Sequence, residues 1–345
     1  MFACECWYVA ALCDELGPGM LTRTIAGEDL ILYRKEDGGA VAFIDRCPHR
    51  LAPLSLGTRV GDGIQCGYHG LMFGSDGRCT HIPNQEKIPA RFRATTLPVV
   101  ERWGLVWTWL GDPGHADVSK LPADFHWQEE PDWAPLFGYI KVEGNYQLLV
   151  DNLLDLSHET FLHQHTIGNA AVAEADSQVA TYPHKVEVTR EMLDCPPPAL
   201  FAKAGGFTTN IDRYQHIKFM PPCFVAVEVK AAAAGTGNFD AGVRWWVLNA
   251  LTPDTETSTH YFWGLPRKFR QDDTALTEML EAGVLRTFGE DKAIIEAQQL
   301  ILAKTPLETR TIHIKVDEAP TRAREMVTRM IERERADAVT PELAS

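Results

Sequence analysis

The segment CPHRLAPLSLGTRVGDGIQCGYHG, residues 47–70, carries one Cys-x-His pair and, after sixteen intervening residues, one Cys-x-x-His pair. Such side chains bind soft transition metals, and two loops can bring both pairs around one centre. Four cysteines would suit an ordinary ferredoxin cluster, whereas two cysteines and two histidines divide into a thiolate iron and an imidazole iron. The pattern therefore predicts a [2Fe-2S] cluster held by Cys47, His49, Cys66 and His69.

A structural zinc site is the alternative, because two cysteines and two histidines also form a tetrahedral zinc set. In this chain each loop supplies one of each residue type instead of the Cys-x-x-Cys pair that is common at zinc sites. Pro48 stiffens the first loop, and Gly67 and Gly70 let backbone N–H groups of the second approach bridging sulfides. The local pattern favours the iron–sulfur cluster.

Short β-type runs surround these pairs and predict a small antiparallel β domain over residues 1–115. The segment GDPGHADVSKLPAD, residues 111–124, is rich in Gly, Pro and Asp and predicts a linker. Beyond it, strand-like runs within 179–265 lie between two other segments: residues 139–166, which look helical after a short strand, and the helix-like residues 272–303. These segments predict a second, α+β domain that covers residues 116–345.

The charge and hydropathy of the chain exclude several classes of partner. It has 33 basic and 47 acidic residues, a net charge of -14, which argues against nucleic acid and anionic membrane surfaces. No apolar run approaches the roughly 20 residues that cross a bilayer, and the N-terminus lacks the basic region of a signal peptide. We expect a cytoplasmic protein whose eight cysteines are thiols or metal ligands.

A second group of metal-binding residue types lies in DNLLDLSHETFLHQH, residues 151–165. On an ideal helix His158 and His163 lie about 140° apart, so a shared ion would require a local break between them. His165 lies near the His158 face but about 10.5 Å along the axis. The angle favours His165 and the reach favours His163, so helix geometry leaves the choice open.

Histidines on a helix are commonly solvated, and two alone are weak support for a metal site. The predicted cluster changes this, because an iron held by two histidines and one carboxylate keeps open positions for dioxygen and needs an electron source. We therefore expect a mononuclear iron here. Its third ligand must come from another segment, and FGEDKAIIEAQ, residues 288–298, offers Glu290, Asp291 and Glu296.

Several motifs, spread over nearly the whole chain, are together typical of one protein family. They are WYVA (7–10), CPHR and APLSLG (47–57), CGYHGL (66–71), VDNLLDLSHETFLH (150–163), LTPDTETS and YFWG (251–264) and EDKAIIEAQ (290–298). Together they resemble the Rieske non-haem iron oxygenases, and among these the oxygenase components of the vanillate O-demethylase type. The resemblance implies an α+β fold: an N-terminal antiparallel β Rieske domain, then an α+β catalytic domain with a curved antiparallel sheet and flanking helices.

The resemblance also implies roles for individual residues. Cys47 and Cys66 would bind one iron of the cluster and His49 and His69 the other, while the mononuclear iron would be held by His158, His163 and Asp291, with Glu290 as the fallback. Asp155 would hydrogen-bond an iron-ligand histidine, here His158, and a cluster histidine, here His69, of neighbouring subunits. Asn152 either lies near the iron or belongs to a solvated helix face.

The family precedent implies a homotrimeric terminal oxygenase that uses O2 and NADH-derived electrons from a separate flavin and ferredoxin-type reductase. Its expected reaction is the O-demethylation of a methoxylated, vanillate-like aromatic acid with release of formaldehyde. The chain has no Gly-x-Gly-x-x-Gly fingerprint after a strand, in line with a separate reductase. The alternatives are a ring-hydroxylating dioxygenase, a demethylase for another ether, N-methyl group or sulfonate, and an electron-transfer protein with an inactive catalytic domain.

The sequence also offers candidate residues for a substrate pocket. In VRWWVLNAL, strand alternation puts Asn249 on one face with apolar neighbours, and Cys223 lies in the similar run CFVAVEV. We expect Asn249, with Cys223 nearby, to line the cavity and bind the polar group of the substrate; the alternative is that Asn249 caps the strand end. Arg213 and His216 are weaker candidates for holding a carboxylate, because charged residues there would also suit a solvated face.

Overall fold

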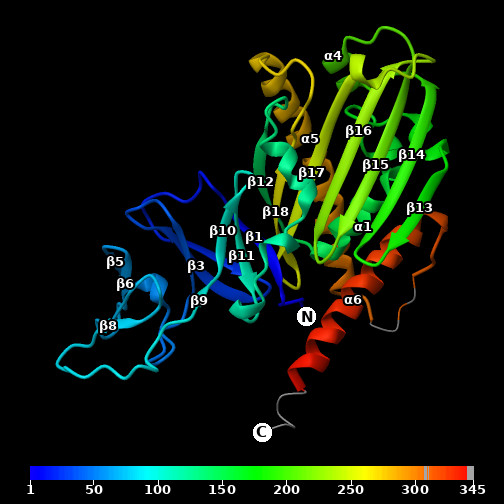
Figure 1. The fold of residues 1–345 in the computed structure, drawn as a ribbon. Helices are drawn as coiled ribbons and strands as arrows, with labels where there is room; N and C mark the ends of the chain where they lie inside the picture. Colours follow the sequence, from blue (N-terminus) through cyan, green and yellow to red (C-terminus); the bar gives the residue numbers. More distant parts are fainter. Residues whose placement is uncertain (307–308, 310, 340–345) are drawn as a thin grey trace. The chain divides into compact units, whose positions relative to one another are not determined.

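The computed structural model describes residues 1–345 except 307–308, 310 and 340–345 (Figure 1). Contacts divide the chain into two compact units, Met1–Leu121 and Pro122–Ser345. The division falls inside the predicted linker, and the functional limits of 1–115 and 116–345 stay a prediction. Among the helices that the structure describes, none combines the length and apolar character needed to cross a membrane.

The first unit consists of antiparallel β-structure, as predicted. Its three sheets have the strand orders β1-β11-β10, β2-β3-β4-β9 and β5-β6-β7-β8. The strands are β1 (Cys6–Leu12), β2 (Leu21–Ile25), β3 (Glu28–Arg34), β4 (Ala40–Ile44), β5 (Thr58–Val60), β6 (Gly63–Gln65), β7 (Met72–Phe73), β8 (Cys79–His81), β9 (Thr96–Leu97), β10 (Val99–Arg102) and β11 (Leu105–Leu110). The four-stranded sheet β5-β6-β7-β8 carries the second Cys/His loop between β6 and β7.

The second unit is built on one antiparallel sheet with the strand order β12-β18-β17-β16-β15-β14-β13 (Figure 1). The strands are β12 (Phe137–Val142), β13 (Ser177–Tyr182), β14 (Lys185–Cys195), β15 (Ile211–Met220), β16 (Phe224–Ala233), β17 (Val243–Thr255) and β18 (Ser258–Gly264). Alternation buries one face of β15 through Ile211, Arg213, Gln215, Ile217 and Phe219, so two polar residues share this row with apolar ones.

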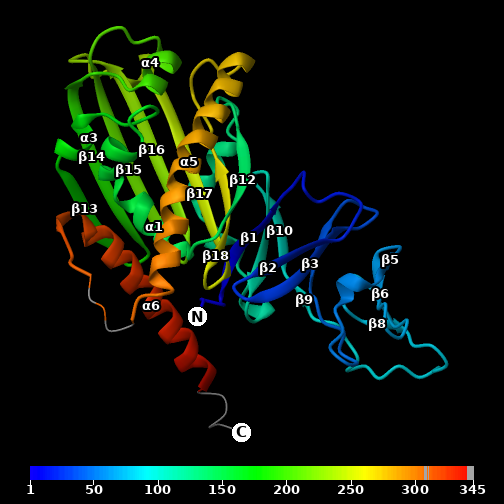
Figure 2. The ribbon, with the colours of Figure 1, turned by 180° about the vertical axis from the view of Figure 1, so that it is seen from behind.

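Helices cover one face of this sheet. Figure 2 shows α1 and α5 running across it, with α6 beside α1. The helices are α1 (Tyr146–Leu154), α2 (Glu159–Leu162), α3 (Ala170–Glu174), α4 (Ala199–Gly205), α5 (Thr274–Leu302) and α6 (Glu318–Val339). The prediction of a long helix over 272–303 is confirmed by α5.

The segment 139–166 is not one helix, which corrects the sequence-based interpretation. Helix α1 begins at the N-cap Asn145, whose side chain accepts a hydrogen bond from the Gln147 N–H, and ends at Leu154. Asp155 leaves helical geometry with φ −116° and ψ 92°, and a short 3-10 turn over Leu156–His158 precedes α2. This break changes the angle between His158 and His163 that an ideal helix would impose.

Helix α5 presents an apolar stripe to the sheet and carries one acidic residue within it. The buried residues are Leu276, Leu280, Val284, Thr287, Phe288, Asp291 and Ile295. Their spacing of three and four residues is that of one helix face. A buried carboxylate in this stripe requires a partner, because a lone charge away from water is costly.

Candidate metal centre and substrate cavity

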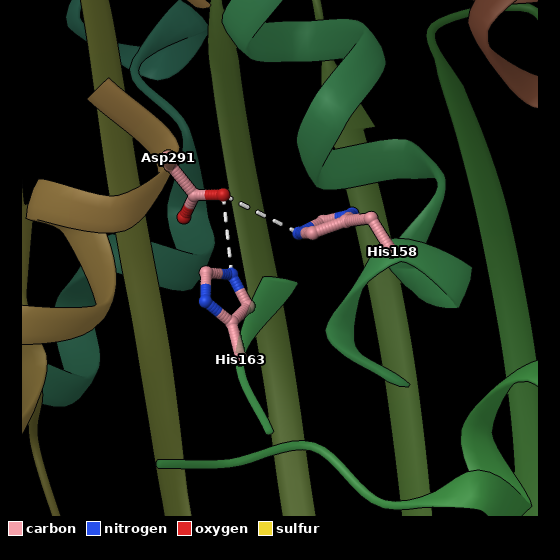
Figure 3. Close-up of side chains that lie close together, drawn as sticks. All are labelled: His158, His163 and Asp291. Carbon is pink, nitrogen blue, oxygen red and sulfur yellow. Dashed lines mark hydrogen bonds and ion pairs between the residues drawn. The ribbon is translucent and has the colours of Figure 1, made fainter. Parts of the chain in front are cut away.

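Three side chains from separate segments converge beneath α5 (Figure 3). His158 ends the 3-10 turn, His163 follows α2, and Asp291 comes from α5. One potential ligand atom from each lies within 4.8 Å of the others. The Asp291 Oδ1 atom is 3.1 Å from His163 Nε2 and 3.4 Å from His158 Nε2.

Both imidazoles are oriented through their other ring nitrogen. His158 Nδ1 donates to the main-chain carbonyl of Asp155 at 2.6 Å, and His163 Nδ1 donates to Glu290 Oε2 at 2.7 Å. Carbonyl and carboxylate oxygens only accept, so each Nδ1 donates outward and each Nε2 is the ring atom that faces Asp291. The two Nε2 atoms and the Asp291 carboxylate therefore face one point, as metal ligands do.

The structure brings His163, and not His165, into this group. His163 is 1% exposed, whereas His165 is exposed at the surface. The loop after α2 packs closely against it and fixes the position of His163. The Gly168 N–H donates to the His163 carbonyl, and a Cβ at Gly168 would lie 1.9 Å from the Glu159 carbonyl oxygen. Only glycine fits there, so the loop can fold tightly against α2.

The three carboxylates of residues 288–298 have different partners. Asp291 faces Nε2 of the two histidines, while Glu290 accepts a hydrogen bond from Nδ1 of His163. Glu296 pairs with Lys292 at 2.7 Å and accepts from the Glu143 N–H at 2.8 Å, away from the group. The sequence could not separate these roles, because adjacent helix positions differ by about 100° and either could face inward.

Asn152 and Asp155 both lie beside the group. The Asn152 Nδ2 donates to Asp291 Oδ1 at 3.1 Å and lies 3.4 Å from His158 Nε2. The Asp155 carboxylate accepts from the Ser157 N–H at 2.9 Å, and its contact with His158 is made by the main-chain carbonyl. The contact between Asp155 and His158 within this chain is therefore not the carboxylate hydrogen bond that the resemblance implied.

Burial and charge oppose each other at the three side chains. Burial alone would raise the pKa of Asp291, but hydrogen bonds and charge from His158 and His163 lower it to about 2. Burial would lower the pKa of both histidines, and the Asp291 carboxylate raises them instead. A carboxylate with a lowered pKa between two imidazoles is a site that suits a divalent cation.

A cavity of about 90 Å³ adjoins the three side chains. Apolar residues from the sheet and from α5 form most of its wall, among them Val227, Trp245, Val247 and Phe288. His158, His163 and Asp291 line it as well, so a molecule inside would touch the predicted iron ligands. Such an apolar pocket with a few polar groups is typical of small-molecule sites.

Asn249 and Cys223 do not line this cavity, which corrects the expected substrate contacts. Both side chains are fully buried. The Asn249 amide donates to the carbonyls of Val225 and Val247, and its oxygen accepts from the Tyr261 hydroxyl at 2.6 Å. These bonds satisfy the amide inside the protein, so Asn249 links β17 to β16 and to Tyr261 on β18.

Of the two weaker candidates, Arg213 lines the cavity and His216 does not. His216 projects from the opposite face of β15, where its Nε2 lies 3.3 Å from Glu187. Glu159 and Gln215 also line the cavity and were missed from the sequence. The period-two pattern of β15 contained a signal for Gln215, because it places this residue on the apolar face with Arg213.

In the first unit the two Cys/His loops meet. Cys47 and Cys66 are both buried, and burial, together with the neighbouring Cys66 thiol, raises the pKa of the Cys47 thiol to about 11. The His49 and His69 rings lie 4.6 Å apart between centroids, nearer the surface. None of the eight cysteines, all within the described part of the chain, forms a disulfide.

The donor sets fit the two groups that the sequence predicts. Two buried thiols behind two more accessible imidazoles match a cluster with one thiolate iron and one imidazole iron. Two imidazole Nε2 atoms and one carboxylate match the ligand set of a mononuclear iron with open coordination positions.

The position of Glu290 leads to a testable prediction. Removing a partner that orients a metal-ligating histidine typically weakens metal binding roughly 10- to 100-fold. We expect Glu290→Leu to raise the iron dissociation constant by that factor, with Glu290→Gln intermediate because its amide oxygen still accepts from His163. Competition with a chelator measures it, and Glu281→Leu, at an exposed site of α5, is the control. Unchanged iron affinity in Glu290→Leu would show that this carboxylate has no orienting role.

Comparisons with known proteins agree with this geometry. Residues 6–98 match the Rieske [2Fe-2S] domain, and residues 142–333 match the vanillate O-demethylase oxygenase C-terminal domain. The chain is 38% identical to a putative toluene-4-sulfonate monooxygenase iron-sulfur subunit of Comamonas testosteroni, over 95% of this chain and 96% of the relative. It is 36% identical to the vanillate O-demethylase oxygenase subunit of Pseudomonas sp. (strain HR199 / DSM 7063), over 98% of both.

The crystal structure of dicamba monooxygenase bound to 3,6 dichlorosalicylic acid superposes with a TM-score of 0.91 at 34% identity, covering 96% of this chain and 98% of that one. The α+β fold with an N-terminal Rieske domain is thereby confirmed. The chain belongs to the Rieske non-haem iron oxygenases, in the group with the vanillate O-demethylase C-terminal domain, and is a monooxygenase component that carries a [2Fe-2S] cluster and a mononuclear iron.

Proposed function

We propose that this chain is the terminal oxygenase of a system that O-demethylates a methoxylated aromatic acid. The observation that carries the proposal is the apolar cavity whose wall includes His158, His163 and Asp291. Relatives named as vanillate and dicamba O-demethylase oxygenase components support the choice of reaction. An aromatic ring fits an apolar wall that contains Trp245 and Phe288.

The overall reaction joins an aryl methyl ether, O2, two electrons and two protons, and gives a phenol, formaldehyde and water. One oxygen atom enters the methyl C–H bond, and the resulting hydroxymethyl ether loses formaldehyde as its C–O bond breaks. Bound iron would supply oxygen activation at its open positions, with electrons stored by the cluster. We assign the iron to His158, His163 and Asp291.

The other residues position these ligands and exclude water. Glu290 and the Asp155 carbonyl hold the Nδ1 protons of the two histidines, while Asn152 donates to Asp291. The apolar wall keeps the reacting methyl group out of water, which limits side reactions. We assign the cluster to Cys47, His49, Cys66 and His69; a colourless protein that binds one zinc ion at these four side chains would contradict this.

The electrons are proposed to come from a separate NADH-dependent reductase with flavin and ferredoxin-type centres, in the cytoplasm.

We also propose a homotrimer in which Asp155 links the iron centre of one subunit to the cluster of its neighbour. Asp155 lines an open groove with Phe161, Ile294 and Ile312, and these three apolar side chains are exposed. Exposed apolar side chains around a groove favour a protein partner. A monomer in sedimentation equilibrium would contradict the trimer.

A second candidate is the hydroxylation of a ring methyl group on an arenesulfonate, favoured by the relatives named as toluene-4-sulfonate monooxygenase subunits. A panel of methoxybenzoates and toluenesulfonates, with a surrogate reductase, separates the two. We expect formaldehyde and a phenol from a methoxybenzoate. A benzylic alcohol from a toluenesulfonate would support the second candidate. A cis-diol would indicate ring dioxygenation, and oxygen uptake with no organic product would leave only electron transfer.

A further inference from the structure

A polar cluster interrupts the apolar wall of the cavity at one place. Arg213 and Gln215 reach it from β15, and Glu159 reaches it from α2. All three side chains are at most 3% exposed. Gln215 pairs with Val229 on β16, and Val229 pairs with Trp245 on β17, so the cluster continues the row of residues that forms the cavity floor.

The hydrogen bonds inside the cluster leave part of Arg213 unused. Glu159 Oε1 accepts from Gln215 Nε2 at 2.8 Å, and Oε2 accepts from Arg213 Nη2 at 3.4 Å. Arg213 Nε and Nη1 have no hydrogen-bond partner among the residues that the structure describes. The Phe201 ring, which also lines the cavity, lies under the guanidinium at 4.3 Å. A buried guanidinium held this way is rigid and keeps donors to spare.

A second buried arginine beside the cluster also keeps unpaired donors. Arg190 on β14 pairs with Gln215 across the sheet, is buried, and also has Nε and Nη1 unpartnered within the described chain. Glu159 is the carboxylate that hydrogen-bonds Arg213. Burial lowers the pKa of Arg213 and Arg190; Glu159 opposes this at Arg213, and Glu159 and Asp155 oppose it at Arg190. Unpaired buried donors are costly, so the cluster lacks an anionic acceptor.

We propose that Arg213 anchors the anionic group of the aromatic substrate, a carboxylate or a sulfonate, at this side of the cavity. The proposal rests on the proposed function and names the residue that recognises the acidic group of its substrate. The oxyanion supplies the acceptor oxygens, in charge-assisted hydrogen bonds. Gln215 donates to Glu159 Oε1, and the other oxygen of this carboxylate accepts from Arg213 Nη2. A neutral amide offers one carbonyl acceptor and no charge, so its hydrogen bonds to Arg213 are weaker.

The first test uses the wild-type holoenzyme without reductase, so that no turnover occurs. Calorimetry measures Kd for the meta and para isomers of methoxybenzoate, methoxybenzenesulfonate and methoxybenzamide. We expect the carboxylates, the sulfonates or both to bind at least about tenfold more tightly than the neutral amides, because hydrogen bonds to charged groups contribute that much. Preference for one of the two oxyanions identifies the natural acidic group. Equal binding of acid and amide overturns the proposal.

The second test removes the charge. Arg213→Met alone would leave Glu159 buried and unpaired, which can prevent folding, so the informative variant is Arg213→Met with Glu159→Gln. We expect it to bind the amides as before and to lose the preference for oxyanions. Arg213→Lys should keep part of that preference, because it keeps the charge but not the planar donors. Lys218→Met is the matched control, since Lys218 pairs with Asp124 from the other face of β15.

The outcomes separate this proposal from the proposed function. An oxyanion preference that survives in the double variant overturns the role of Arg213, even if formaldehyde is still released. Absence of formaldehyde from every methyl ether, with the oxyanion preference present in wild type and lost in the double variant, overturns the O-demethylase reaction and supports the anchor.

Discussion

His163→Ala is expected to lose the mononuclear iron, whereas His165→Ala, two residues away, keeps it. His163 is buried with its Nε2 at 3.1 Å from Asp291, while His165 is exposed. Loss of a residue that hydrogen-bonds a metal ligand can weaken metal binding roughly 100-fold. Loss of the ligand itself should weaken iron binding more than that. Formaldehyde release should fall to background in His163→Ala only.

Iron content after exhaustive dialysis, measured by mass spectrometry, checks this. The electron paramagnetic resonance signal of the cluster is the internal control, because His163 lies in the other compact unit from Cys47 and Cys66 and its loss should leave that signal unchanged. Loss of iron from His165→Ala with retention in His163→Ala would show that the ligand assignment is wrong.

Asp155→Asn is expected to keep both metal centres and to lose turnover by roughly 10- to 100-fold. The substitution is informative because the structure separates the functions of this residue. Its main-chain carbonyl binds His158, and one side-chain oxygen accepts from the Ser157 N–H. Asparagine preserves both contacts, so only the negative charge and the second carboxylate oxygen are removed.

Stopped-flow absorbance of the cluster separates the two electron-transfer steps in this variant. Reduction by the surrogate reductase should match wild type, while re-oxidation of the reduced cluster with substrate and O2 should be slow. Re-oxidation at the wild-type rate would remove Asp155 from the path between the centres.

The sequence predicted the parts of this molecule that depend on local patterns. The short β-type runs around the Cys/His pairs correspond to strands in the structure, and the long helix-like segment at 272–303 corresponds to α5. Spacing alone could not choose between His163 and His165, because the choice depends on the break at Asp155 and on the close packing of Gly168 against α2. Those are tertiary contacts, which helix geometry does not contain.

The substrate cavity was the part that sequence reasoning placed wrongly. Asn249 was chosen as an amide in an apolar row, but its partners are carbonyls on its own and the adjacent strand and the Tyr261 hydroxyl. Arg213 was ranked low because a charged residue on a strand usually faces water. Its alternation with Ile211 and Ile217 already placed it on the buried face. In strands, the face that a residue occupies was a better guide than its side-chain type.

The separation of the ligands along the chain has a thermodynamic consequence. His163 and Asp291 lie 128 residues apart, and the strands from β13 to β18 lie between them in the sequence. An ion held by both would act as a cross-link between α5 and the short turns after α1. Because binding occurs only when these segments are folded together, occupancy would stabilise the entire second unit by mass action. Selection for tight iron retention would then also be selection for the conformational stability of the sheet and its helical layer.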